Sequence, residues 1–193
     1  MNPEISSIPV PGPWSERVNS RSDPLTDYEN GSAALGAASD SNAFEWMATS
    51  DGSSVWVSRE GVAPVLVLTD TGITEVALAF DQTMNPHIAY VAGGVAKWYW
   101  WDTLTSAYAT MTLTDCRSPR CCSDEKDPLL TADRDIILTY MRDDKLFVRL
   151  QRDRFGVEYE KVPETEAHEP LTETTKIVSI CMNTGRRLQW RMS

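Results

Sequence analysis

The stretch HIAYVAGGVAKWYWW at residues 87–101 decides the fold class of this chain. Both halves are rich in β-branched and aromatic residues, which favour strands, and Gly93-Gly94 between them suits a tight hairpin turn. Alternation along the second half divides its large rings between two faces, with Trp98 and Trp100 on one and Tyr99 and Trp101 on the other. Both faces therefore need cover, which another sheet of the same chain, a second copy or a different protein can supply.

Two further stretches align with this hairpin and indicate an internal repeat. SVWVSREGVAPVLV at 54–67 lies over it at a constant offset of 33 residues, and IILTYMRDDKLFVRL at 136–150 places Asp143-Asp144 on the glycine pair. Strand-like segments precede two of the units, at 77–81 and 119–125. Each unit therefore reads as strand, loop, hairpin and strand. Four antiparallel strands repeated about every forty residues are typical of a propeller blade.

The rest of residues 44–161 follows the same pattern of short strands and turns. Further strand-like runs are FEWMAT, EVALAF, YATMTLT and GVEYEKV, and no long window shows the apolar period of a helix. We predict an all-β, antiparallel fold of blade-like four-stranded repeats, arranged as a partial propeller or a sandwich. Closed propellers usually contain four to eight blades, whereas this body offers about two and a half, so sheet faces and strand edges should remain open.

The N-terminal residues 1–43 are predicted to form an extended, proline-rich arm. Five of the eleven prolines lie there, and proline fixes φ and lacks a backbone donor, so IPVPGPW favours an extended course. The later stretch NGSAALGAASDSN is too small and polar to repay the entropy of ordering. An arm that docks on a neighbouring subunit is one reading; a terminus that is disordered or lies along its own body is the other. The candidate docking residues are Pro11, Pro13 and Trp14.

The C-terminal part divides into an acidic connector at 162–175 and a β-hairpin at 176–193. The connector holds four acidic residues and no basic one, whereas the hairpin holds four basic residues and no acidic one. Two alternating runs flank a short loop that contains Gly185. The hairpin can complete an earlier sheet or add strands to a neighbour, and its basic face suits an acidic partner or is simply solvated. Its candidate interface residues are Arg186, Arg187, Trp190 and Arg191.

The sequence contains no recognisable catalytic or metal-binding motif. His87 and His168 lie in no hydrolase, metalloprotease or phosphate-binding pattern, and we expect each to be solvated or at a strand edge. We predict that the acidic residues around 124–135 are solvated side chains of a loop, and that they form neither a calcium-binding loop nor the carboxylate pair of a glycosidase. Reduced thiols are expected in preference to a zinc site at the four cysteines, Cys116, Cys121, Cys122 and Cys181. We therefore predict no catalytic residue, no cofactor and no metal.

Length and composition exclude several classes of protein. The 193 residues suffice for one sizeable core or two small ones. A net charge of −10 argues against a nucleic-acid-binding surface, where a basic face is expected. No apolar run is long enough for a membrane-spanning helix, and the N-terminus shows no secretory signal.

Residues 77–108, 118–159 and 177–192 carry a family resemblance, and LFVRLQRDRFGVEY is its most specific part. These stretches resemble virion structural proteins of tailed bacteriophages, in particular tail-associated components of short-tailed phages. The resemblance covers about residues 44–192. It implies a non-enzymatic subunit in the tail or head–tail region, present in several symmetric copies that contact each other and other virion proteins such as tail or adaptor subunits. Assembly in the reducing host cytoplasm would agree with unpaired thiols.

A carbohydrate-binding module is the alternative function. The aromatic run, here represented by Tyr99 and Trp101, could stack on sugars, although strand aromatics on both faces more often form core or a subunit interface. SDGSSVW at 50–56 resembles a sialidase-type box with the wrong inner spacing, and the other units lack it, which weighs against hydrolysis. We therefore list Tyr99 and Trp101 with the interface candidates of the arm and the hairpin.

Overall fold

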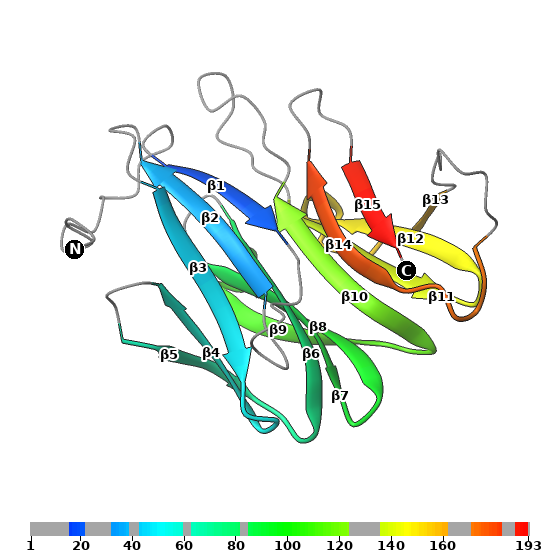
Figure 1. The fold of residues 1–193 in the computed structure, drawn as a ribbon, viewed down its shortest axis with the longest axis horizontal. Coiled ribbons are helices and arrows are strands. Elements are labelled where there is room, and N and C mark those ends of the chain that lie inside the picture. The colour runs from blue at the N-terminus through cyan, green and yellow to red at the C-terminus, as the bar shows by residue number, and fades with distance from the viewer. Residues whose placement is uncertain are drawn as a thin grey trace.

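The computed structural model describes residues 16–21, 32–38, 43–59, 63–81, 85–123, 136–161, 171–182 and 188–192. Within these ranges the regular structure is antiparallel β strand, apart from one 3₁₀ turn at Gln151–Asp153. Figure 1 shows a row of sheets that follow one another along the chain, from the blue and cyan strands to the orange and red pair. The predicted all-β class is confirmed.

The second and third sheets are four-stranded meanders, as the repeat predicts. Their strand orders are β6-β7-β8-β9 and β10-β11-β12-β13. The bounds of the second sheet are Ile73–Phe80, Pro86–Ala92, Val95–Asp102 and Ala107–Leu113, and those of the third are Cys116–Ser123, Ile136–Arg142, Lys145–Leu150 and Tyr159–Lys161. Two of the three aligned stretches are thus the central hairpins β7–β8 and β11–β12. The third, at 54–67, spans β4 (Ser54–Arg59) and β5 (Val65–Thr69) at the edge of a five-stranded sheet, so it is not the centre of a four-stranded unit.

The first sheet contains five strands in the order β1-β2-β3-β4-β5. Their bounds are Glu16–Arg21, Ser32–Ala38, Ala43–Ser50, Ser54–Arg59 and Val65–Thr69. β1 and β2 fall within the residues predicted to form an arm, and the structure pairs β1 with β2 and β2 with β3. The remaining residues of that segment, Pro11, Pro13 and Trp14 among them, lie outside the described ranges.

The fourth sheet is the C-terminal hairpin. β14 (Ile177–Met182) and β15 (Leu188–Met192) pair in antiparallel fashion, and the loop between them lies outside the described residues. Most of the predicted acidic connector, 162–170, also lies outside them. No helix in the described part of the chain is long and apolar enough to cross a membrane.

Apolar side chains stack the four sheets in chain order. Val55, Val57 and Leu68 of the first sheet pack on Leu78 and Ile88 of the second. The other face of the second sheet meets the third through residues that include Trp98, Leu138 and Phe155. The far face of the third sheet meets the hairpin through residues that include Met141, Leu146 and Ile180. The second and third sheets are therefore covered on both faces, as blades are.

Short turns of defined geometry hold these strands in register. Gly93 and Gly94 both adopt positive φ, 58° and 77°, in the two-residue turn between β7 and β8. Asp143 has a φ of 54° at the equivalent turn between β11 and β12. Glycine reaches this region without strain and aspartate tolerates it. The predicted correspondence of the two turns is confirmed.

The alternation of the aromatic run in β8 is confirmed, and the chain's own sheets supply the cover. Trp98 is fully buried against Phe155, with ring centroids 5.0 Å apart, and Trp100 meets the same ring at 5.7 Å. Tyr99, on the opposite face, packs against the core shared with the first sheet. Of the three possible sources of cover, another sheet of the same chain is the one found for these residues.

Candidate interaction surfaces and buried polar clusters

Three aromatic rings form a row on the outer part of the second sheet. Tyr99 and Trp101 lie on β8, and Tyr108 lies on β9 opposite Trp101. The Tyr99 and Tyr108 rings stack with centroids 4.6 Å apart, and Trp101 meets Tyr108 edge to face at 5.1 Å. Burial raises the pKa of both tyrosines, although Tyr108 keeps 36% of its surface exposed. The two candidates on β8 thus belong to one aromatic row that is only partly open to solvent.

At the end of β8, Asp102 lies on the face that also carries Trp98 and Trp100, opposite this row. The carboxylate of Asp102 accepts hydrogen bonds from Arg154 at 2.6 and 3.3 Å and from the Leu104 backbone N–H at 3.1 Å. The bond from Arg154 lowers the pKa of Asp102. Leu104 itself is 73% exposed. The Asp102–Arg154 pair therefore ties β8 to the segment before β13 and forms no rim of the aromatic row.

The hairpin carries the other described interface candidates. Trp190 packs, with Leu188 and Met192, against the core of the third sheet and stays half-buried. Its indole Nε1 is buried and has no hydrogen-bond partner among the described residues. Arg191 pairs with Ser179 in the β ladder, and Arg186 and Arg187 lie outside the described ranges. The structure therefore places Trp190 and the Tyr99–Trp101 pair on different sheets.

Two arginines of β10 attach the hairpin segment to the body. A β-bulge separates Arg117 from Arg120 in the ladder with β11. Arg117 donates to the carbonyls of Thr172 and Thr175 at 2.9 and 3.1 Å, and Arg120 donates to that of Val178 at 3.2 Å. Hydrogen bonds from charged donors are stronger than neutral ones. The hairpin is therefore fixed by polar contacts as well as by its apolar face.

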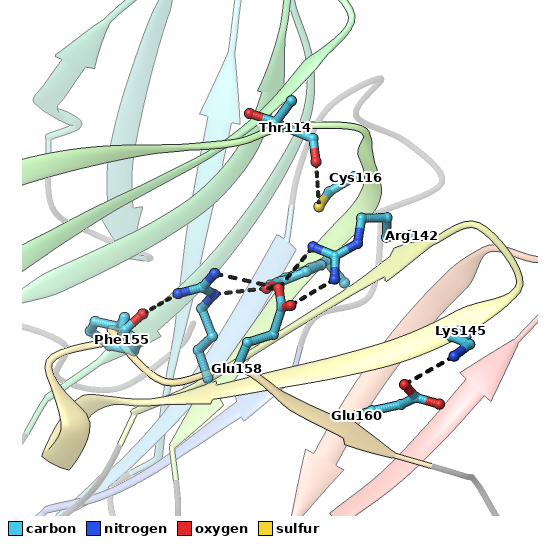
Figure 2. Close-up of polar contacts among 9 residues, drawn as sticks. Thr114, Cys116, Arg142, Lys145, Phe155, Glu158 and Glu160 are labelled. Carbon is cyan, nitrogen blue, oxygen red and sulfur yellow. Dashed lines mark hydrogen bonds and ion pairs between the residues drawn. The ribbon is translucent and has the colours of Figure 1, made fainter.

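The densest polar cluster lies on the third sheet around Glu158, and the sequence patterns did not reveal it. Its carboxylate accepts hydrogen bonds from Arg142 at 2.6 and 3.1 Å, from Arg149 at 3.4 Å and from the Tyr140 hydroxyl. Arg149 also donates to the Phe155 carbonyl at 2.6 Å. Figure 2 shows Glu158 between Arg142 on one side and, on the other, the guanidinium that donates to Phe155, which is that of Arg149. Burial opposes ionisation, but the bonds from Arg142 and Tyr140 lower the pKa of Glu158.

A simpler version of this cluster occurs on the second sheet. The carboxylate of Asp70 accepts hydrogen bonds from the Tyr90 hydroxyl at 3.1 Å and from Lys97 Nζ at 2.6 Å. The sequence alignment that matches the two glycines with Asp143-Asp144 also matches Tyr90 with Tyr140. The second and third sheets thus each tie a buried tyrosine to a carboxylate and a cation. The matched tyrosines were the signal from which these clusters could have been predicted.

His87 is buried, which corrects the expectation of a solvated or strand-edge histidine. It lies in β7 with no exposed surface, and its Nε2 is 3.4 Å from Oδ2 of Asp81. Burial lowers the pKa of His87 more than Asp81 raises it. Burial raises the pKa of Asp81, but hydrogen bonds from His87 and Asn85 outweigh burial and lower the pKa of that carboxyl to about 2. The contact lies beside the Trp98 ring, away from solvent.

The described cysteines do not converge on one point. Cys121 packs in the core between the second and third sheets, whereas Cys122 packs in the core beneath the hairpin. Cys116 donates to the Thr114 carbonyl at 3.1 Å, and burial raises its pKa to about 11. Among the described residues, no three potential metal ligands lie close enough to hold an ion.

No protein-family model, curated protein or solved structure matches this chain.

Proposed function

We propose that this chain is a structural component of a tailed-phage virion, in the tail or head–tail region. In this role it joins neighbouring subunits or fibres through its arm and through β-sheet contacts. The observation that carries the proposal is that some sheets have their full set of strands and others do not. The second and third sheets have four strands and two covered faces, whereas the hairpin sheet has two described strands, whose described side chains pack on the third sheet.

The two ends of the stack differ from each other. At one end, Trp56 lies on the face of β4 opposite the buried Val55 and Val57, and its cross-strand neighbour Leu66 is 53% exposed. At the other end lies the basic hairpin (Figure 1). Unlike ends favour head-to-tail contacts between identical subunits, which close into rings or extend into tubes. Both are the assemblies that a tail subunit would form.

The part-buried polar clusters of the second and third sheets suit a subunit that must keep one shape. The Glu158 cluster and the Asp70 cluster both tie strands of one sheet to a neighbouring loop. Such networks specify one arrangement when their members are satisfied. The family resemblance of residues 77–108, 118–159 and 177–192 supports the same role.

Immunogold labelling of purified particles of the encoding phage tests this proposal. We expect an antibody against the chain to label the tail or head–tail vertex, and protein mass spectrometry of the same particles to detect the chain. A chain that is abundant in infected cells but missing from purified particles would contradict a virion role.

Carbohydrate binding is a second candidate, and the row of Tyr99, Trp101 and Tyr108 favours it. Partly exposed rings that lie side by side offer the stacking surface that sugars require. A glycan array tests it. Binding that Trp101→Ala abolishes and Tyr159→Ala preserves would support this function, because Tyr159 is a comparably exposed ring on a different sheet.

A further inference from the structure

β9 is the last strand of the second sheet, and one of its two edges is open among the described strands. It pairs with β8 along its whole length and with no other described strand. Its exposed side chains are Ala107, Tyr108, Thr110 and Thr112. In an antiparallel ladder, alternate residues direct their N–H and carbonyl groups to opposite edges. An edge strand of seven residues therefore presents a row of backbone donors and acceptors that another strand can bind.

β9 lacks the features that usually keep an edge strand from pairing. These features are charged side chains, proline and β-bulges. Residues 103–114 contain no charged residue and no proline, although the chain has a net charge of −10, and the ladder with β8 has no register shift. The last strands of the neighbouring sheets are protected. β13 has only three residues and carries the Lys145–Glu160 ion pair, and β5 follows Pro64 and contains a register shift.

The sequence of β9 is complementary to itself in the antiparallel direction. Pairing about its middle residue, Thr110, sets each alanine of one face opposite a large apolar residue, and it sets the tyrosine of the other face opposite a threonine. The pairs are Ala107 with Leu113, Ala109 with Met111, Tyr108 with Thr112, and Thr110 with its own copy. Aromatic side chains opposite β-branched ones, and threonine opposite threonine, stabilise antiparallel sheets. The strand therefore supplies both sides of a favourable ladder.

We infer that β9 binds β9 of a second copy of this chain, as an antiparallel pair about a two-fold axis at Thr110. Such a contact uses the same surface on both subunits. It would bring Thr112 of the second copy against Tyr108, which keeps 36% of its surface exposed. A different protein fits this edge less well, because the edge carries no charge by which to select one.

This contact would add to the head-to-tail contacts of the proposed assembly. β9 belongs to the second sheet, which is covered on both faces and forms neither end of the stack. The inference rests on the proposed function, because it names a contact through which copies of the subunit would join.

Opposite charges placed at the two-fold axis test the inference. Thr110 is exposed, so the single chain should tolerate a charged side chain there. In a pair of identical copies, Thr110→Glu or Thr110→Lys sets two like charges directly opposite each other, which destabilises the pair. An equal mixture of the two variants sets opposite charges there. Thr69→Glu is the matched control, because it changes an exposed threonine on the edge strand of another sheet. We would measure association of the full chain by sedimentation velocity, and amide exchange of residues 107–113 at low and high concentration.

The unchanged chain should associate and should protect all of residues 107–113 only when associated. Each Thr110 variant should associate about tenfold more weakly, whereas the mixture and Thr69→Glu should stay within about threefold of the unchanged chain. A mixture as weak as its components, or variants that associate like the unchanged chain, would overturn the inference and leave the virion role standing. Full protection of 107–113 in a monomer would also overturn it, because the same chain would then cover the edge. Particle labelling decides the virion role separately.

Discussion

Arg120 on β10 binds Glu75 on β6 across the interface between the second and third sheets, with Nη1 2.8 Å from Oε2. The same guanidinium donates from Nε to the Val178 carbonyl of β14. One side chain therefore ties three of the four sheets together. Arg120 keeps 8% of its side chain exposed and Glu75 33%, so the contact is better sheltered than a surface ion pair.

Replacing Arg120 should destabilise the stack more than removing the charge of its partner. Arg120→Met leaves the Val178 carbonyl unpaired and Glu75 without its cation, and we expect a loss of about 2 kcal/mol in the free energy of unfolding. Glu75→Gln keeps an acceptor at a site that is one-third exposed, so it should cost less than about 1 kcal/mol. Urea unfolding measures both. Equal effects would show that Arg120 does not act through the hairpin.

Loss of the hydroxyl group should destabilise the chain at both buried tyrosines, and more at Tyr140. Tyr90→Phe removes the bond to Asp70, whereas Tyr140→Phe removes both the bond to Glu158 and the acceptor of Arg149 Nε. The free energy of unfolding should fall by about 1 kcal/mol for Tyr90→Phe and about 2 kcal/mol for Tyr140→Phe, because each such bond is worth about 1 kcal/mol. Thermal or urea unfolding tests the pair. A neutral change at either site would contradict a structural role for its cluster.

The repeat made most of the body predictable. The Gly93-Gly94 hairpin and its match at Asp143-Asp144 located β7, β8, β11 and β12, because turn chemistry and alternation are local properties. β1 and β2 were not predicted. SAALGAA, the sequence of β2, has little strand preference of its own, and it forms a strand by pairing with β1 and β3. Local patterns alone do not contain that pairing.

His87 should make folding less favourable as the pH falls from 7 to 5. The unfolded chain binds a proton at His87 near pH 6.5, whereas burial lowers the pKa of the folded side chain, so acid favours the unfolded state. His87→Gln should flatten the slope of unfolding free energy over this range. His168→Gln, which changes the only other histidine, should keep it. The same slope in both variants would refute the assignment.

Asp81 should add a second loss of stability at lower pH. Its pKa is about 2 in the folded chain against 3.8 in the absence of structure. The stabilisation is complete above pH 3.8 and is lost as the pH falls towards 2. Asp81→Asn should reduce that part of the acid transition, measured by circular dichroism. A wild-type acid midpoint in the variant would argue against this carboxylate.

The aromatic residues of β8 should separate into structural and surface roles. Trp98→Ala removes a fully buried ring and should cost about 3–5 kcal/mol. Trp101→Ala removes a half-buried ring at the edge of the row and should cost about 1 kcal/mol while weakening self-association or glycan binding. Unfolding and sedimentation measurements on both variants test this. A Trp101 variant with unchanged binding to copies and to glycans would remove it from the interface.

The buried clusters show which part of a site sequence reasoning missed. Glu158 and Arg142 are sixteen residues apart, and nothing in their spacing distinguishes them from solvated charge. They meet because β13 returns beside β12 and brings Glu158 next to Tyr140. His87 was misjudged for a related reason, since its burial depends on Phe155, supplied by the following sheet.

The mass of the purified full chain, measured by light scattering across a range of concentrations, tests the central claim most directly. A structural subunit with unlike, partly uncovered ends should form discrete multimers or growing assemblies of the 21.6 kDa chain as concentration rises. A chain that stays a monomer at every concentration would contradict assembly through its own copies.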